Sequence, residues 1–432
     1  MIKMNTEQIA LQAQDAHKRT LTLIDGLSKE QLIGPLLPIV NPLLWEIGHV
    51  AHFYEFWVLR KHLKQPPLIA NADSLYDSMT IAHDERWNLP LPSLKNTLNY
   101  MQAVLDNIQE CLTTGEDKVR DYLVQYAVFH QDMHNEAYTY TRQTLDYPAP
   151  PIKNFDKENS MCKTTFNRGR VSGDTKIPGG IFMLGATKGD EFVFDNEKWA
   201  HPVEIMPFNI AITAVSNAEY LLFVEAGGYE KHEYWDNEGW KWREQKQLLH
   251  PIYWRSTNNG WQVKHFDHWS NMKMHNALIH VCWHEAQAYC RWAERRLPTE
   301  AEWEAAAAAE PIFTLVNRRY PWGENTPQAQ LANLDGYTLD TVDVAAYAAG
   351  DSAFGCRQMI GNVWEWTQDT FTPYPGFEPD MYKDYSQPLF GNTKVLRGGS
   401  WATRSRMIRN SWRTYYGPER NDVFAGFRTC AL

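Results

Sequence analysis

The pattern of apolar residues changes near residue 147, and that change limits the fold more than any single motif does. Before it, apolar residues recur every three or four positions, which is the period of an amphipathic helix. The runs with this period are 6–27, 42–63, 95–113 and 117–145. After a stretch rich in Pro, Gly and polar residues, the apolar runs become short and are separated by turn-forming residues. We therefore predict an α+β multidomain chain with a four-helix bundle at 1–147, a linker at 148–178 and a mixed domain at 179–432.

The mixed domain carries local signals for helices and strands. Ser216 and Thr299 each stand three residues before a Glu, which is the pattern of a capping box at a helix start. They predict helices at 216–225 and 299–308, and an amphipathic pattern predicts a third helix at 283–295. Strand-like runs occupy 179–185, 201–210, 394–401 and 424–432.

Charge and composition exclude several classes of protein. The chain has 432 residues and a formal net charge of −10, whereas a nucleic-acid-binding protein needs a basic patch. It has no run of about 18 apolar residues to span a membrane, and its first residues carry no apolar leader. The six cysteines form no CxxC pair, so they indicate neither a zinc site nor a disulfide framework. We therefore expect no nucleic-acid or membrane partner and a location in the reducing cytoplasm.

Two histidines four residues apart, His130 and His134, lie in the predicted helix 117–145. Residues at this spacing share one helix face, with Cβ atoms about 5–6 Å apart, so two imidazoles can converge on one metal ion. Both continue the apolar stripe of the helix, although a lone inward histidine is more often a hydrogen-bonded core residue. That stripe runs through Val119, Leu123, Tyr126, Ala127, Met133 and Ala137. The pair predicts a metal site, and Glu136, about 200° around the helix from His134, is expected in its outer layer or in solvent.

The predicted helix 42–63 offers further histidines. Asn41 is expected as its N-cap, with Pro42 in the first turn. His49 and His52 both lie on its inner face, and spacing alone does not choose between them as a third ligand. Three imidazoles with open coordination positions suit Fe(II), and zinc is the alternative on ligand chemistry alone.

A long loop between the second and third predicted helices carries His83 and Arg86. Loops of this length are often functional. We regard both residues as candidates for the site. The alternative is a polar surface segment that Trp87 anchors.

Five blocks in the mixed domain resemble the formylglycine-generating-enzyme type of fold, a C-type-lectin-like α+β domain. They are RRLPTEAEWEAAA (295–307), RRYPWG (318–323), GNVWEWT (361–367), LRGGSW (396–401) and FAGFR (424–428). The bundle resembles DinB-type metal-binding domains. The two together, with LWEIGHVAHF and HQDMHNE in the bundle, resemble the ergothioneine-pathway sulfoxide synthases and the related selenoneine synthases. This resemblance covers essentially the whole chain.

The resemblance implies a three-histidine iron(II) site. Its motif W-[DE]-[LI]-[AG]-H places the first ligand at His49, which makes His52 a packing neighbour, and the other two ligands match His130 and His134. The implied reaction is the O2-dependent attachment of sulfur or selenium to the imidazole carbon between the two nitrogens of hercynine, the trimethylated betaine of histidine. The implied partners are small molecules: hercynine, O2 and a thiol or selenosugar donor.

The resemblance also implies a substrate segment at NSWRTYYGPER (410–420). A trimethylammonium group donates no hydrogen bond and is best held against aromatic faces. Thr414, Tyr415 and Tyr416 are therefore candidate pocket residues, with core packing as the alternative. The letters depart from the RNWD-type sequence of one branch. Met133 is a further candidate, and it stands where one branch has a polar residue between the ligands.

A tyrosine near the metal can supply a proton in such a reaction. Tyr374, in FTPYPGF, is the candidate catalytic residue, and a tyrosine packed on the prolines of a turn is the alternative. We assign four other residues of the motif blocks to the interior of the domain. They are Trp364, Trp366, Arg397 and Trp401.

The donor is the finest distinction that the sequence suggests. The branch that uses γ-glutamylcysteine holds its carboxylates with two arginines, whereas the matching positions here are His83 and Arg86. The blocks at 192–204, 233–244, 250–255 and 411–430 look closer to the selenoneine synthases, so we favour a selenosugar donor over cysteine or γ-glutamylcysteine.

Other classes of function stay open. One is a DinB-like thiol transferase that uses zinc or nickel and needs no oxygen. Another is a lectin-like binding module without catalysis, which leaves the inward His130 and His134 unexplained. Formylglycine generation relies on a cysteine pair, and Cys356 and Cys430 lie in motif blocks without an evident pairing.

Overall fold

The chain forms two compact units, Met1–Ile152 and Lys153–Leu432, in the computed structural model. The structure describes residues 5–152, 171–189, 192–312 and 316–432. Most of the linker predicted at 148–178 lies outside these ranges, because residues 153–170 are not among them. Cys162 also lies outside the described residues.

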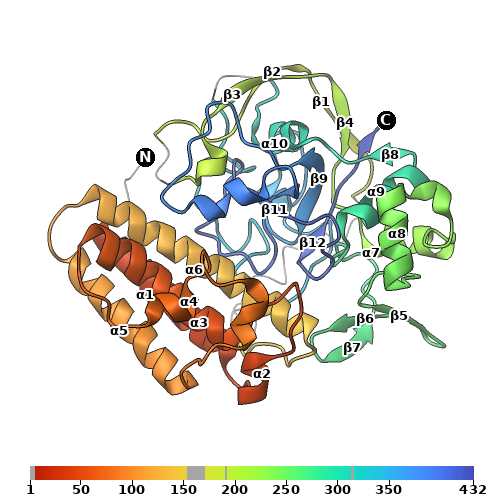
Figure 1. The fold of residues 1–432 in the computed structure, drawn as a ribbon. Coiled ribbons are helices and arrows are strands. Elements are labelled where there is room, and N and C mark those ends of the chain that lie inside the picture. Colours follow the sequence, from red (N-terminus) through yellow and green to blue (C-terminus); the bar gives the residue numbers. More distant parts are fainter. Residues whose placement is uncertain (1–4, 153–170, 190–191, 313–315) are drawn as a thin grey trace. The chain divides into compact units, whose positions relative to one another are not determined.

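The first unit is a bundle whose long helices run side by side (Figure 1). Its helices are α1 (Thr6–Ile24), α2 (Lys29–Ile33), α3 (Leu43–Tyr54), α4 (Ala72–Tyr76), α5 (Leu94–Leu112) and α6 (Lys118–Thr144). A π-helix, Glu55–His62, continues α3, and a 3-10 turn, His83–Trp87, lies in the loop before α5. Helix α6 packs on α1 and α3, and α5 packs on the same two helices.

Side chains at the helix starts explain where most of these helices begin. Asn5 caps α1 with a complete capping box, Ser93 accepts from the backbone at the start of α5, and Asp117 does so for α6. The prediction that Asn41 caps the second long helix is wrong. Pro42 is the residue before α3, and its ψ of 123° is not helical. The amide of Asn41 instead donates to Glu46 Oε1 at 2.8 Å.

The burial of α6 departs from the predicted pattern at Val119, Glu136 and Met133, the last of which is half-buried. Val119, placed in the apolar stripe, is 56% exposed, because it lies in the first turn of α6. Glu136, expected in an outer layer or in solvent, is buried. The amphipathic pattern predicts one buried face and one face in solvent. The central turns of α6 are instead buried over most of their circumference, so the face expected in solvent is covered as well.

The second unit combines helices with several small, mostly antiparallel sheets (Figure 1). Its longer helices are α7 (Asn217–Glu225), α8 (Asn237–Lys246), α9 (Trp283–Trp292) and α10 (Glu300–Ala308). The strands are β1 (Asp174–Ile177), β2 (Gly180–Leu184), β3 (His201–Ile205), β4 (Phe208–Ala211), β5 (Trp254–Thr257), β6 (Gly260–His265), β7 (His268–Asn271), β8 (Arg295–Arg296), β9 (Trp364–Thr370), β10 (Lys394–Arg397), β11 (Arg413–Tyr416), β12 (Ala425–Gly426) and β13 (Cys430–Ala431).

The two four-stranded sheets have the orders β1-β4-β13-β8 and β11-β10-β9-β12. The second is antiparallel except where the short β12 pairs parallel with β9. Ser216 and Thr299 cap α7 and α10 with complete capping boxes, which confirms both predicted helix starts. Strand-like 201–210 divides into β3 and β4, and strand-like 424–432 divides into β12 and β13.

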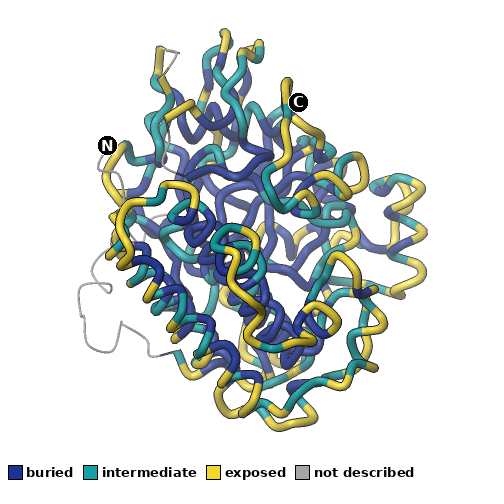
Figure 2. The backbone as a smooth tube through the Cα atoms, turned by 60° about the vertical axis from the view of Figure 1, so that its left-hand side comes forward, coloured by how far each residue is buried: buried dark blue, intermediate teal, exposed yellow. Residues whose placement is uncertain are grey.

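The core of the second unit forms around α10. The four alanines at 305–308 are fully buried, which lets the helix pack closely on β2, β9 and β10. Trp364, Trp366, Arg397 and Trp401 are all buried, as the sequence predicted. In Figure 2 the buried backbone runs through the inside of each unit, and exposed residues gather in loops and at helix surfaces. The described part of the chain contains no helix long and apolar enough to cross a membrane.

Candidate metal centre

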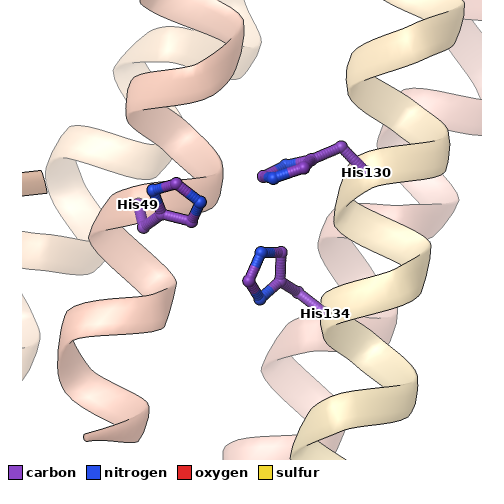
Figure 3. A group of neighbouring side chains, drawn as sticks. All are labelled: His49, His130 and His134. Atoms are coloured by element: carbon purple, nitrogen blue, oxygen red, sulfur yellow. The ribbon is translucent and has the colours of Figure 1, made fainter. Parts of the chain in front are cut away.

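Three histidines from two helices of the bundle meet at one point (Figure 3). His49 comes from α3, and His130 and His134 come from successive turns of α6. Each offers one ring nitrogen, and these nitrogens all lie within 4.8 Å of one another. His49 and His130 are 4% exposed, while the side chain of His134 is 18% exposed. Among the described residues this is the only cluster of three or more His, Cys, Asp or Glu that could hold a metal ion.

A close approach of helix α4 to α3 fixes the ring of His49. A Cβ atom at Gly48 would lie 2.0 Å from the ring of Tyr76, so only glycine permits this contact. The contact brings the carbonyl oxygen of Tyr76 to 2.8 Å from His49 Nδ1. A carbonyl only accepts, so Nδ1 carries the proton and Nε2 keeps its lone pair.

Aromatic rings hold the other faces of these imidazoles. Trp45 stacks on His49 with ring centroids 4.7 Å apart and an interplanar angle of 9°. Phe53 stacks on His130 with centroids 3.9 Å apart. Trp45 and Phe53 both belong to α3, so this helix fixes the ring orientation of His49 and also that of His130 on α6.

Burial favours the neutral form of His49 and His130. It lowers the pKa of His49 and His130 well below the ordinary value, and the neighbouring imidazole of His134 lowers both further through charge repulsion. Neutral imidazoles are the form that binds a metal ion. Three imidazoles within a few ångströms of one another fit a divalent transition metal, and they are a donor set that iron, zinc, copper and nickel all accept.

The structure brings His49 into the cluster, whereas His52 points to another partner. His52 Nε2 lies 2.8 Å from Asp73 Oδ1, and its ring packs on Phe56. His52 stands three residues after His49, so its side chain leaves α3 about 60° away around the axis and about 4.5 Å further along it, and it meets Asp73 and not the cluster.

Glu46 is a residue of this site that the sequence reasoning missed. Its carboxylate is 3% exposed, and its Oε1 lies 3.5 Å from His134 Nδ1. A sequence signal existed, because Glu46 stands three residues before His49 and therefore on the same side of α3.

The side chains of His83 and Arg86 lie close to the start of α3, and both make hydrogen bonds there. His83 Nε2 lies 2.7 Å from the carbonyl oxygen of Val40. Arg86 donates to Asn41 Oδ1 at 2.7 Å, and its Cζ lies 4.1 Å from the ring centroid of Trp45. Met133 is half-buried on α6 beside His134. Their substrate-binding roles stay predictions.

Strand β11 of the second unit divides the three candidate pocket residues between two faces. Tyr415 shares a face with the buried Arg413 and stacks on Phe371, with ring centroids 4.2 Å apart. Thr414 and Tyr416 lie on the opposite face, and both are half-buried. The packing of Tyr415 favours the core interpretation for that residue. Thr414 and Tyr416 stay candidates for substrate contact.

Tyr374 lies in the core of the second unit with 6% of its surface exposed. Its hydroxyl donates to Glu300 Oε1 at 3.3 Å, and the Cζ of Arg413 lies 4.0 Å from its ring centroid. Burial raises the pKa of this hydroxyl well above its ordinary value. These contacts favour a packing role for Tyr374. Its catalytic role stays a prediction.

Cys356 and Cys430 are buried free thiols. Burial raises the pKa of Cys356 to about 11 and that of Cys430 to about 12, so both thiols are protonated and unreactive near neutral pH. This argues against the formylglycine-generating alternative, which needs a reactive cysteine pair.

Two families of domains match this chain in sequence. Residues 12–136 match the DinB superfamily, and residues 162–431 match the sulfatase-modifying factor enzyme 1-like domain. The formylglycine-generating enzyme of Streptomyces coelicolor is 32% identical over 298 residues, which cover 60% of this chain and 88% of that protein. These matches confirm the predicted α+β architecture of a DinB-like bundle followed by a formylglycine-generating-enzyme-like domain.

Full-length relatives share both domains. The hercynine oxygenase of Mycolicibacterium thermoresistibile is 36% identical over 431 residues, which cover 98% of this chain and 94% of the relative. The hercynine oxygenase of Mycobacterium tuberculosis is 36% identical over 426 residues, which cover 98% of each chain. Identity of this extent across both domains shows that the chain belongs to the hercynine oxygenase family of enzymes.

Proposed function

We propose that this enzyme joins sulfur or selenium to the imidazole C2 of hercynine in an O2-dependent reaction, with Fe(II) held by His49, His130 and His134. The observation that carries the proposal is the convergence of three ring nitrogens, all within 4.8 Å of one another, in a chain related over its whole length to hercynine oxygenases.

Iron is the metal that the donor set and the relatives' activity favour together. Three imidazoles leave coordination positions open, as a metal that also binds substrate requires. When bound, Fe(II) would supply the one-electron chemistry with O2 that zinc does not. The chain's own residues fix the ligands: Tyr76 orients His49 through its carbonyl, and Phe53 orients His130 through stacking.

We further propose that the sulfur or selenium donor is a selenosugar. A dicarboxylate donor such as γ-glutamylcysteine needs cationic side chains to receive it. Arg86 already donates hydrogen bonds to Asn41 Oδ1 and to the carbonyl oxygen of Ile81. His83 Nε2 is hydrogen-bonded to the carbonyl oxygen of Val40. These partners support a donor with fewer carboxylates. Cysteine or γ-glutamylcysteine, as in the ergothioneine pathway, is the alternative.

Aerobic incubation of the purified protein with Fe(II), hercynine and one donor at a time tests both levels of the proposal. The donors are a selenosugar, cysteine and γ-glutamylcysteine, and mass spectrometry identifies the product. A hercynine–selenium product only with the selenosugar supports the full proposal. A sulfoxide product with a thiol keeps the reaction class and overturns the selenium donor.

An anaerobic arm separates the oxygenase from the thiol transferase. Turnover without O2, with zinc or nickel in place of iron, would overturn the oxygenase proposal. Binding of hercynine without any turnover, unchanged after metal removal, would instead favour the non-catalytic binding module.

A further inference from the structure

We propose that Glu46 is a positioning residue of the metal centre, which fixes the ring of His134 and strengthens it as a metal ligand. The proposal rests on the three-histidine centre proposed above. It adds a residue that touches none of the reacting atoms and acts through a ligand.

The carboxylate of Glu46 is buried beside the ligand His134, which is its ion-pair contact among the described residues. Oε1 accepts a hydrogen bond from Asn41 Nδ2 at 2.8 Å and lies 3.5 Å from His134 Nδ1. In the described part of the chain, Oε2 has no hydrogen-bond partner. A buried carboxylate that lacks partners lowers stability, so a fold keeps one where it serves another purpose.

The distance of 3.5 Å is just longer than a good hydrogen bond. Hydrogen bonds at active sites are commonly long in the ligand-free state and tighten when the site is complete. His134 Nδ1 has no other partner among the described residues. A carboxylate at that nitrogen selects the ring form with the proton on Nδ1, which leaves the Nε2 lone pair for a metal ion.

The same carboxylate connects to the opposite ligand through side-chain contacts. Asn41, which holds Glu46, accepts from Arg86 at 2.7 Å through its Oδ1. The guanidinium of Arg86 covers Trp45, and Trp45 stacks on His49. This chain of contacts gives Arg86 a role in holding the ligand geometry.

His49 and His134 differ in the oxygen atom that lies next to their Nδ1 atoms. His49 faces the neutral carbonyl of Tyr76, whereas His134 faces a carboxylate. A carboxylate raises the basicity of an imidazole ligand more than a neutral acceptor does, and it favours the more highly charged metal ion. Removing the charge of Glu46 is therefore expected to weaken metal binding and to raise the Fe(III)/Fe(II) reduction potential.

A purely structural role for Glu46 makes a different prediction. Glu46 lies in the first turn of α3, where a negative charge stabilises the helix slightly. If that were its whole role, Glu46→Gln would change the stability of the bundle and leave the metal's properties unchanged.

The test compares Glu46→Gln with wild type and with Glu55→Gln in the full-length protein. Glu55 is a matched control, because it is a fully buried glutamate that follows α3 directly and bonds Tyr100 and the backbone of Leu68, not a candidate ligand. The measurements are the Kd for Co(II) by chelator competition, the visible spectrum of the Co(II) protein, and the reduction potential of the iron-loaded protein. Circular dichroism establishes folding first.

Glu46→Gln is expected to weaken Co(II) binding by about 10–100-fold, to shift the Co(II) spectrum and to raise the potential. Glu55→Gln is expected to leave all three unchanged. Binding by Glu46→Gln within twofold of wild type, with the same spectrum and potential, would overturn the proposal. If Glu46→Gln does not fold, Asn41→Ala, which frees the carboxylate from its holder, is expected to show the same changes at smaller size, and their absence overturns the proposal equally.

Failure of the metal centre itself has a separate outcome. Wild-type protein that binds neither Co(II) nor Fe(II) would refute the three-histidine centre. Tight binding by wild type that is unaffected by Glu46→Gln would refute only the role of Glu46.

Discussion

The second unit buries arginines and glutamates in matched pairs, whereas the first unit buries imidazoles and a carboxylate with few partners. In the second unit, Arg397 and Arg413 each bond Glu300 at 2.7 Å, and Arg428 bonds Glu365 at 2.6 Å. Burial alone would raise the pKa of Glu300, but the charges of the two arginines hold it below its ordinary value. These charges balance one another and fix the strands that carry them.

In the first unit, several buried polar groups around the metal centre lack a hydrogen-bond partner among the described residues. Within the described residues, Glu46 Oε2, His134 Nδ1 and the hydroxyl of Tyr138 lack a hydrogen-bond partner. Charge repulsion from Glu46 and, above all, burial raise the pKa of Tyr138 well above its ordinary value. The described part of the second unit also has buried polar atoms without a partner, among them Arg397 Nε and His280 Nδ1. The difference is therefore one of place: in the first unit such atoms lie beside three converging imidazoles that could hold a ligand.

Removing a candidate ligand should have the largest effect. His49→Ala, His130→Ala and His134→Ala are each expected to abolish metal binding and turnover while the second unit stays folded, because two imidazoles do not hold the ion. Metal analysis of the purified variants measures the change.

His52→Ala is the matched control, since His52 is equally buried in the same helix but bonds Asp73. It should keep full metal content. A metal-free His52→Ala together with a metal-loaded His49→Ala would show that the ligands were assigned incorrectly.

Breaking a charge pair in the second unit should have the next largest effect. Glu300→Ala leaves Arg397 and Arg413 without their shared carboxylate, so the free energy of unfolding should fall by about 3–5 kcal/mol. Chemical denaturation with a probe in the second unit measures it. Glu238→Gln, at an exposed site on α8, should change it by less than about 0.5 kcal/mol, and an equal loss in both variants would contradict the role of the buried pair.

Acidification should lower the stability of the first unit by a smaller amount. The folded pKa values of His49 and His130 lie below the ordinary value of 6.5, so the unfolded chain takes up protons first as pH falls. The free energy of unfolding of the metal-free first unit should therefore decline below about pH 6.5, by up to about 1.4 kcal/mol per pH unit for each histidine. Denaturation of metal-free protein at several pH values measures this slope, and a slope that persists in the His49→Ala/His130→Ala double variant would assign it to other groups.

Tyr374→Phe should have the smallest effect. It removes one hydrogen bond to Glu300, and we expect a loss of about 0.5–1.5 kcal/mol in the stability of the second unit without a change of product. Denaturation and product analysis by mass spectrometry measure the two quantities. A redirected product with unchanged stability would instead support the predicted catalytic role of Tyr374.

Features that depend on neighbouring residues in the chain could be predicted from the sequence. The capping boxes at Ser216 and Thr299 lie within one helical turn, so their partners are fixed by spacing. The pairing of His130 with His134 on one face of α6 has the same cause. The charge of −10 and the motif blocks of the second unit likewise required no knowledge of distant contacts.

Features that depend on contacts between distant segments could not be predicted in this way. Asn is a residue type that is favoured at N-caps, yet the side chain of Asn41 makes hydrogen bonds with Glu46 and Arg86 instead. The burial of Glu136 follows from the coverage of α6 on more than one side. Residue type alone could not show that Tyr374 would meet Glu300, 74 residues away.

The sequence by itself determined the two-domain architecture, the helix that presents His130 and His134, and membership of a family, because these follow from local periodicity and from motif letters. Helix spacing left His49 and His52 open, and the motif letters pointed to His49; the tertiary structure shows why His49 joins the cluster and that Glu46 stands behind His134. The direction of a buried side chain depends on what packs against it: Tyr76 pressed onto Gly48 turns His49 inward, and Asn41 holds Glu46 in place.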